Sequence, residues 1–250
     1  MSTNESNQIL HGVVLHSRPF GEQDLILTVY TAEHGPVRMM AKSVRRSKKY
    51  SVLYAQVFTY SQFTAFAGRS GMYSIDSAEV LCPFYDLRYD LTRLALAQYF
   101  AEVMTYLPEN GENSATLLKL FLNSLHLLSE TDFDETLIKL VFEFNFCRYD
   151  GVLPEITCRE CGALPARWSF SDGFFCLDHA KERGVPLTES MVRVLLYLAG
   201  HEGSAAYAFS TSPENLVYLS DVFSRYLAYH LEQEPESLAY YQELRRGLTV

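Results

Sequence analysis

The periodicity of the apolar residues changes at Pro83, and this change sets the fold class. Before Pro83 the apolar residues come in short segments rich in β-branched and aromatic side chains, as is typical of strands. Five or so short strands in about 75 residues favour a small closed or nearly closed barrel over an open sheet. The expected strands are residues 9–18, 24–31, 36–44, 52–67 and 71–81.

After Pro83 the apolar residues recur with the period of a helix. Pro108 ends the first of these segments, while Thr188 and the Ser212-Pro213 pair are signals that begin later helices. The sequence therefore predicts an α+β protein, with a barrel domain at 1–81 and an α-helical domain at 82–250. The expected helices are residues 87–107, 114–129, 134–149, 188–200, 213–231 and 236–246.

A group of possible metal ligands interrupts the helices. Two pairs of ligand-type residues, each with two residues between its members, are separated by fourteen residues: Cys158 and Cys161, then Cys176 and His179. Two such pairs on tight turns can converge on one tetrahedral zinc ion and give it three thiolates and one imidazole. Gly162 lets the chain turn after the first pair, and Gly173 stands where the intervening strands would reverse. We therefore predict a zinc-ribbon-like module at 154–183.

Two other interpretations of these cysteines are open. They could be ordinary core residues beside an accidental CxxC, or a redox CxxC of the thioredoxin type. The redox interpretation needs a βαβ context that the sequence lacks, and it leaves Cys176 and His179 unexplained. Four protein ligands fill a tetrahedral shell and leave no position for a catalytic water, so the predicted zinc would be structural.

The charge of the chain is unevenly distributed. The formal net charge is −9 overall, but it is +2 over residues 1–80 and −11 over residues 81–250. The run KSVRRSKK at 42–49 has five basic residues in eight, and it is expected to form an exposed loop at the rim of the barrel. The candidate DNA contacts are Arg38, Lys42, Arg45, Arg46, Lys48 and Lys49.

Aromatic residues follow this basic run: Tyr50, Tyr54, Phe58 and Tyr60. Cations that track phosphates, together with rings on which bases stack, are typical of a surface that binds single-stranded nucleic acid. The rings could instead fill the core of the barrel, and a solvated loop is the alternative interpretation of the run itself.

The sequence contains no sign of an enzyme. It lacks GxxxxGK[ST], GxSxG and HExxH motifs, and helix capping explains Asp132 and Asp134 at a helix start. It also lacks a stretch of about 18 uninterrupted apolar residues, and residues 1–10 do not read as a signal peptide. We expect a non-enzymatic cytoplasmic protein without a membrane span.

Residues 13–49 resemble the N-terminal segment of the RecO family, the bacterial recombination mediators of DNA repair. The CxxC pair and later cysteine, placed after a set of helices, also fit this family, in which many members carry a zinc finger there. The resemblance covers essentially the full length, strongly over 13–49 and by organisation thereafter. The residues that match the family pattern are Leu15, Arg18, Gly21, Glu22, Asp24, Thr31, Gly35, Ala41, Lys42, Arg45, Arg46 and Lys48.

This resemblance implies an OB-fold barrel, a helical domain and a zinc finger. It further implies binding of single- and double-stranded DNA, annealing of complementary strands, and partnership with RecR and with the C-terminal tail of the single-strand-binding protein SSB, so that RecA loads onto coated DNA. The chain departs from the family in two places. Ser43 replaces the usual glycine, and His179 stands where other members have cysteine, a change that zinc accepts.

Two further classes of protein compete with a DNA-binding mediator. One is a zinc-containing interaction adaptor whose basic loop docks an acidic partner. The other is a nuclease or other metal enzyme, which would need a carboxylate constellation and an open metal site that the sequence does not show.

Overall fold

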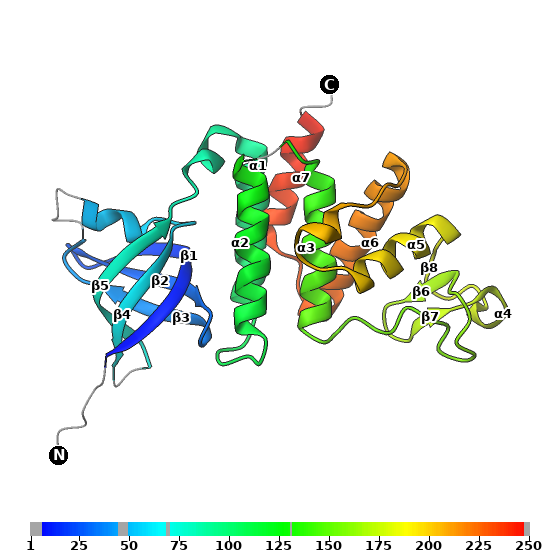
Figure 1. The fold of residues 1–250 in the computed structure, drawn as a ribbon, viewed down its shortest axis with the longest axis horizontal. Helices are drawn as coiled ribbons and strands as arrows, with labels where there is room; N and C mark the ends of the chain where they lie inside the picture. The colour runs from blue at the N-terminus through cyan, green and yellow to red at the C-terminus, as the bar shows by residue number, and fades with distance from the viewer. Residues whose placement is uncertain (1–6, 45–49, 69–70, 131, 248–250) are drawn as a thin grey trace, which may run out of the picture. The chain divides into compact units, whose positions relative to one another are not determined.

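The computed structural model describes residues 7–44, 50–68, 71–130 and 132–247. Four of the candidate DNA contacts lie outside these residues: Arg45, Arg46, Lys48 and Lys49. The chain forms two compact units (Figure 1). The first combines residues 1–131 with 235–250, and the second consists of residues 132–234. The domain boundaries expected from the sequence stay predictions.

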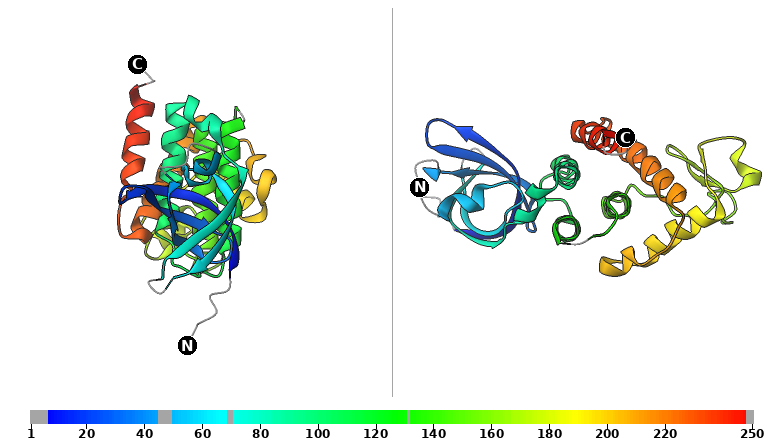
Figure 2. Two further views of the ribbon diagram at one scale, coloured as in Figure 1. Left: turned by 90° about the vertical axis from the view of Figure 1, so that its left-hand side faces the viewer. Right: turned by 90° about the horizontal axis from the view of Figure 1, so that it is seen from above.

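Five strands form a closed barrel at the N-terminus, shown toward the viewer in the left panel of Figure 2. They are β1 (Gln8–Phe20), β2 (Asp24–Thr31), β3 (Gly35–Ala41), β4 (Tyr60–Ala67) and β5 (Tyr73–Cys82). Their order is β1-β2-β3-β5-β4, with β4 pairing back onto β1. β3 and β5 run parallel, and the other neighbours are antiparallel. This confirms the α+β class and the OB-like barrel.

The core of the barrel follows from strand alternation. Leu27 and Val29 of β2 and Met39 of β3 point inward and are fully buried, whereas Arg38 points outward and is exposed. Gly12 of β1 lies where the backbone of β2 approaches closely. A Cβ at this position would come within 2.6 Å of Val29 Cγ1 and 2.8 Å of the Tyr30 carbonyl oxygen. A larger residue there would force β1 and β2 apart.

The chain differs from the sequence prediction just before β4. The strand expected at 52–67 begins only at Tyr60, and a 3-10 helix, η2 (Tyr50–Ala55), precedes it. The positive φ of Phe58, +65°, turns the chain between them. The Phe58 side chain is buried, and the Tyr54 ring packs edge-on against Phe63 at 6.2 Å. These two rings therefore belong to the barrel core and not to a base-stacking surface.

The rest of the first unit is helical. It comprises the 3-10 helix η3 (Tyr85–Tyr89), α1 (Leu91–Thr105), α2 (Ser114–Glu130) and the C-terminal helix α7 (Glu236–Gly247). The helix expected at 87–107 is thus shorter, because Asp90 is an N-cap whose carboxylate accepts hydrogen bonds from the N–H groups of Thr92 and Arg93. α7 comes from the far end of the chain and packs against α1 (Figure 1).

Glu102 of α1 fastens α7 in place. Its carboxylate accepts hydrogen bonds from the Glu236 N–H at 3.0 Å, the Ser237 N–H at 2.9 Å and the Tyr106 hydroxyl at 2.7 Å, and also from the Ser237 hydroxyl. Burial acts to raise the pKa of Glu102, but the hydrogen bonds from Ser237, Tyr106 and Glu236 outweigh it and lower the pKa. The charged form of Glu102 is therefore favoured by folding.

We expect this contact to make stability depend on acid pH. A carboxyl whose pKa is lowered by folding stabilises the protein above its ordinary pKa of 4.5, and the effect is lost as the pH falls through the lower folded value. Glu102→Gln should therefore lower the free energy of unfolding at pH 7 by about 1 kcal/mol, as is typical of a removed helix cap. Its melting temperature should be correspondingly below that of the wild type. The gap between the two melting temperatures should close on acidification toward pH 3. A gap that stayed constant with pH would contradict this assignment.

The second unit begins and ends with helices. It contains α3 (Glu135–Tyr149), β6 (Arg167–Ser169), β7 (Gly173–Phe175), α4 (Leu177–Ala180), β8 (Val185–Pro186), α5 (Glu189–Gly200), η4 (Gly203–Tyr207) and α6 (Pro213–Leu231). Asp134, Thr188 and Ser212 are N-caps, as their positions in the sequence predict. Across the described part of the chain, no helix is long and apolar enough to span a membrane.

A buried ion pair within α3 is hydrogen-bonded to α6. The Lys139 Nζ lies 2.9 Å from the Glu143 carboxylate, and both side chains are almost completely buried. The ammonium group also donates to the Ser220 carbonyl at 3.2 Å and contacts the Ser224 hydroxyl, which in turn donates to Glu143 Oε1 at 3.0 Å. The charges are therefore satisfied inside the helix interface.

Candidate metal centre and nucleic-acid interface

Four side chains of the second unit converge at the predicted zinc module. The ligand atoms of Cys158, Cys161, Cys176 and His179 all lie within 4.8 Å of one another. Cys161 Sγ is 3.8 Å from Cys176 Sγ, and His179 Nδ1 is 3.6 Å from Cys158 Sγ and 3.3 Å from Cys176 Sγ. The sulfur atoms of Cys161 and Cys176 are too far apart for a disulfide, whose S–S distance is about 2.05 Å.

These distances fit a tetrahedral zinc ion. Zinc binds sulfur at about 2.3 Å and nitrogen at about 2.0 Å, so ligand atoms at the corners of a tetrahedron lie roughly 3.4 to 3.8 Å apart. The three measured separations are close to this range. Three thiolates and one imidazole also form a donor set that zinc prefers. The residues present therefore fit a closed, four-coordinate zinc site.

Two short turns present the ligands. In the first, the Gly162 N–H donates to the Cys158 carbonyl at 2.8 Å, and Gly162 adopts the positive φ of +73° that closes the turn. In the second, Cys176 is the residue before α4, and the His179 N–H donates to its carbonyl at 3.2 Å. Between them, β6 and β7 form a hairpin that reverses just before Gly173, whose φ is +90°.

The module is anchored on α6 through its only tryptophan. Trp168 of β6 is fully buried, stacks on Phe174 at 4.9 Å, and contacts Tyr226 and Phe223 of α6 at 4.3 and 5.1 Å between ring centroids. Gly184 lets the backbone approach that of Trp168 closely. A Cβ at position 184 would lie 2.2 Å from the Trp168 carbonyl oxygen. Sequence reasoning missed this anchor, although two aromatic-rich segments, WSF and FF, stand between the ligand pairs.

The electrostatics around Cys158 favour its thiolate. Burial acts to raise the pKa of this thiol, but backbone hydrogen bonds from Cys176, Glu160 and Cys161 outweigh it and lower the pKa to about 6. The thiolate is the form of cysteine that binds metal, so Cys158 is suited to a ligand role. The backbone hydrogen bond from Ala163 acts to lower the pKa of Cys161, but hydrogen bonds with Cys158 and Cys176 and burial outweigh it and raise the pKa.

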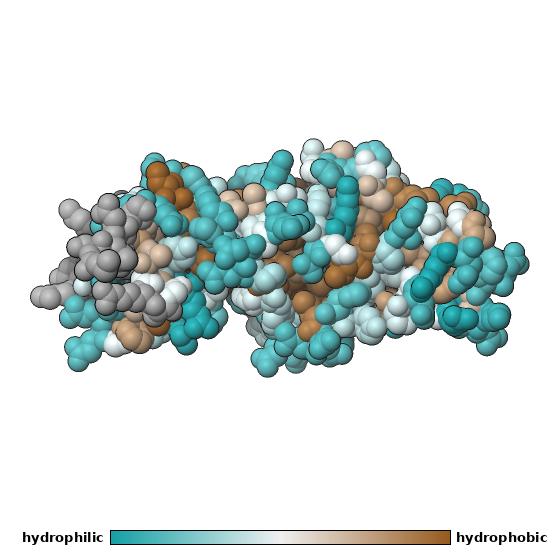
Figure 3. All heavy atoms as spheres, turned by 90° about the horizontal axis from the view of Figure 1, so that it is seen from below, coloured by the Kyte–Doolittle hydropathy of each residue, from teal (hydrophilic) through white to brown (hydrophobic). Residues whose placement is uncertain are grey.

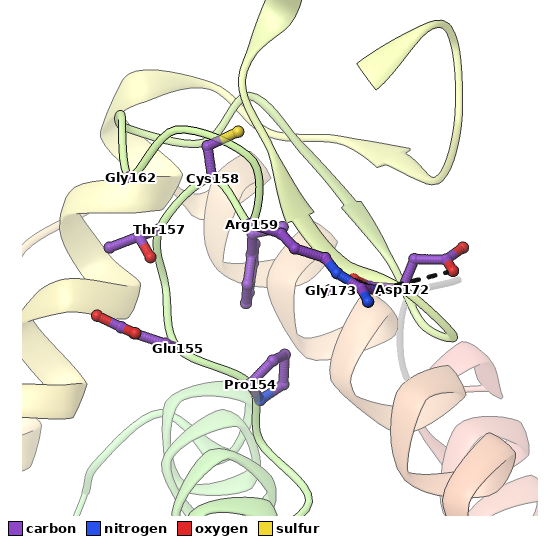
Figure 4. A pocket seen from close by; sticks show the side chains of 9 residues that line it. Pro154, Glu155, Thr157, Cys158, Arg159, Gly162, Asp172 and Gly173 are labelled. Atoms are coloured by element: carbon purple, nitrogen blue, oxygen red, sulfur yellow. Dashed lines mark hydrogen bonds and ion pairs between the residues drawn. The ribbon is translucent and has the colours of Figure 1, made fainter. Parts of the chain in front are cut away.

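A pocket of about 650 Å³ lies beside the first turn (Figure 4). It is lined by Pro154, Glu155, Thr157, Cys158, Arg159, Gly162, Asp172, Gly173 and Phe174. Arg159 spans it and donates to the Asp172 carbonyl at 3.0 Å. In Figure 4 the Cys158 sulfur points away from Arg159 and Asp172, so the polar side chains of the pocket do not face the metal ligand.

The candidate DNA contacts that the structure describes lie on the outside of the barrel. Arg38 of β3 is exposed and pairs across the ladder with Thr28 of β2, which pairs with the exposed His16 of β1. Lys42 is exposed directly after β3. The outer face of β2 and β3 is the surface on which OB-folds bind oligonucleotides. Hydrophilic side chains cover most of the described barrel surface seen in Figure 3, and apolar residues show as small separate patches.

Ser43, the second residue of the basic run, occupies a position whose backbone conformation favours glycine. Ser43 adopts a φ of +57°, in the left-handed region that glycine occupies without strain. Its N–H donates to the Asp24 carboxylate at 2.7 Å, which ties the end of β3 to the beginning of β2. Ser43 thus takes the backbone conformation that suits the glycine of the family pattern, and Asp24 has a role in holding this turn.

The fold and the cysteine site together define a class: an α+β protein in which an OB-like barrel is followed by helices that carry a Cys3His cluster. Sequence comparisons agree with this class. Residues 7–84 match the family described as Recombination protein O N terminal, and residues 88–239 match Recombination protein O C terminal. The chain belongs to the RecO family of DNA repair proteins.

Similar proteins named DNA repair protein RecO match along nearly their whole length. That of Acetivibrio thermocellus is 32% identical over 243 residues, covering 94% of this chain and 96% of the relative. That of Alkaliphilus metalliredigens is 30% identical over 229 residues, covering 89% and 93%. That of Desulforamulus reducens is 29% identical over 246 residues, covering 95% of each. The three matches each cover at least 89% of this chain.

Proposed function

We propose that this RecO-family protein is a non-enzymatic mediator of recombination that binds single- and double-stranded DNA on the outer face of its barrel. In this role it anneals complementary strands and, with RecR, helps RecA to load onto DNA coated by SSB, whose C-terminal tail it contacts. The observation that carries the DNA-binding part is the position of Arg38 and Lys42. Both are exposed on the β2–β3 side of an OB-like barrel and lead into the basic run at 42–49.

We propose that Cys158, Cys161, Cys176 and His179 hold a structural zinc ion. A bound zinc ion would cross-link the two turns. Because four protein ligands would fill its coordination shell, it would have no open position for catalysis. The role of the four residues is to fix the hairpin whose Trp168 packs on α6. The proposed site for DNA remains Arg38, Lys42, Arg45, Arg46, Lys48 and Lys49.

Reversing the charge of the basic run should lower the affinity for DNA and make the affinity less dependent on salt concentration. If the five cations of the run contact phosphates, log affinity for single strands falls with log salt at a slope of up to about 3.5, at ~0.7 per contact. The triple variant Lys42→Glu, Arg45→Glu, Arg46→Glu should lower this slope by about 2 and the affinity by on the order of 10-fold or more. Anisotropy of a labelled oligonucleotide at several salt concentrations measures both.

A matched reversal of three exposed cations in the second unit, Lys181, Arg193 and Arg225, controls for net charge and should change binding much less. Absent or salt-insensitive binding by the wild type would refute DNA binding through this loop. It would favour the adaptor class, in which the loop docks an acidic protein.

A further inference from the structure

Tyr89 is unusually exposed at the junction between the barrel and the first helix, and a second, partly exposed tyrosine, Tyr85, precedes it in η3. In η3, Tyr89 is 87% exposed and Tyr85 is 42% exposed, and Leu91 at the start of α1 is 54% exposed. Burying an aromatic ring is strongly favourable, so a ring left almost wholly in water close in sequence to other exposed apolar side chains is a candidate surface for a ligand or partner.

The segment that carries these rings is held rigidly. Leu87, between the two tyrosines, is 1% exposed, and Phe84 before them is buried in a left-handed conformation with φ of +42°. After them, the Asp90 carboxylate caps α1 by accepting the Thr92 N–H at 2.9 Å and the Arg93 N–H at 3.1 Å. The backbone of η3 is therefore fixed at both ends and in the middle, and its tyrosines are presented with little loss of entropy on binding.

A guanidinium group completes the surface and connects it to the barrel. The Arg88 Cζ lies 5.2 Å from the centre of the Tyr85 ring, a cation–π contact. The Arg88 Nη2 also donates to the Gln56 Oε1 at 2.8 Å. Gln56 directly follows η2, which begins at Tyr50 immediately after the basic run. Arg88, which contacts the Tyr85 ring, therefore lies beside the C-terminal end of η2.

The chemistry of this surface suits bases better than phosphates. Its charge is balanced, since Arg88 is accompanied by Asp86, and Asp90 is engaged by the helix N-terminus and by Arg93 Nε at 3.7 Å. Aromatic faces and an arginine plane are the groups on which unpaired bases stack, whereas cations of the basic run suit the backbone.

We propose that Tyr85 and Tyr89, with Arg88, form a stacking platform for the bases of single-stranded DNA. The platform rests on the proposed DNA-binding function and adds to it a site that distinguishes single strands from duplex. Bases in a duplex are already stacked and paired, so they cannot occupy these rings. The platform would thus hold a single strand by its bases while the barrel face holds the backbone.

The test compares single-stranded with duplex DNA of the same length, by anisotropy at several salt concentrations. Tyr89→Ala should weaken binding of the single strand about 5- to 100-fold, the range expected for one lost base–aromatic stack, and Tyr85→Ala should do so to a smaller or similar extent. Neither should change duplex binding, and neither should change the salt slope, because no phosphate contact is removed. Tyr89→Phe should bind as the wild type, since stacking needs the ring and not the hydroxyl.

Tyr240→Ala is the matched control, because Tyr240 is a 50% exposed tyrosine on α7 of the same unit. An oligonucleotide of abasic sites should bind the wild type and Tyr89→Ala equally. Thermal melting of each variant checks the fold, which removal of an 87% exposed side chain should leave intact. Unchanged single-strand affinity in the Tyr85→Ala, Tyr89→Ala double variant would overturn the platform, as would equal losses on duplex or abasic strands.

The outcomes also separate this platform from the proposed function. If the wild type binds DNA and responds to the charge reversal but not to loss of the rings, only the platform is refuted, and the exposed tyrosines then mark a protein-docking surface. If the wild type binds no DNA, both fall together.

Discussion

Cys158→Ser should abolish zinc binding and unfold the module around the cluster. Structural zinc sites in small modules contribute about 10–16 kcal/mol of apparent binding free energy, far more than the core of a module of this size can replace. Zinc content should fall from one ion per chain to near zero. Trp168 is the only tryptophan and is fully buried, so its emission should shift to the red as it becomes exposed to water. Metal analysis and fluorescence measure the two effects directly.

A strong chelator added to the wild type should give the same fluorescence change, reversed by added zinc. Cys82→Ser is the matched control, because Cys82 is a half-buried cysteine at the end of β5 and not part of the cluster. Its zinc content and emission should equal those of the wild type. Wild-type protein purified without any metal, or full metal content in Cys158→Ser, would refute the site.

Lys139→Met should destabilise the second unit by about 3–5 kcal/mol. The substitution removes the ammonium group that lies 2.9 Å from the fully buried Glu143 carboxylate, and removing one partner of a buried ion pair is strongly destabilising. Replacing both partners, as in Lys139→Met with Glu143→Leu, should restore most of the loss, because the desolvation of both charges is then avoided. Urea unfolding followed by circular dichroism gives the free energies for the four proteins of this cycle.

The control pair is Arg193 and Glu189 on α5, which form an ion pair at 2.7 Å with both side chains mostly exposed. Arg193→Met should cost less than about 0.5 kcal/mol, since water solvates the remaining carboxylate. If Lys139→Met and Arg193→Met lowered the free energy of unfolding equally, burial of the Lys139 pair would make no difference to stability.

Local signals in the sequence predicted much of this fold. The spacing of four ligand-type residues predicted that they converge, and they do. The positions of Asp134, Thr188 and Ser212 predicted where helices begin, because a capping side chain acts on N–H groups two or three residues away. Five short segments rich in β-branched and aromatic residues likewise predicted a barrel, and the five strands close into one.

Features that depend on distant contacts could not be predicted in the same way. Residues 52–59 have strand-like composition, but they form η2 and a turn because Tyr54 and Ala55 fill the barrel core. Lys139 reads as a surface lysine in an amphipathic helix, and only the packing of α6 reveals its burial. The exposure of Tyr89 could not be predicted either, because it depends on which distant segments pack near this residue.

The pairing of α7 with α1 has a consequence for biosynthesis. The ribosome releases the chain from its N-terminus, yet the unit that holds the barrel needs residues 235–250 to be complete. At about 5–20 residues per second, α1 waits on the order of 10 s for its partner, with an apolar face uncovered and the entire second unit made in the meantime. A chain truncated before α7 would therefore carry a barrel with an unfinished helical support, a natural substrate for chaperones and proteases. Only a chain translated through α7 delivers the finished first unit.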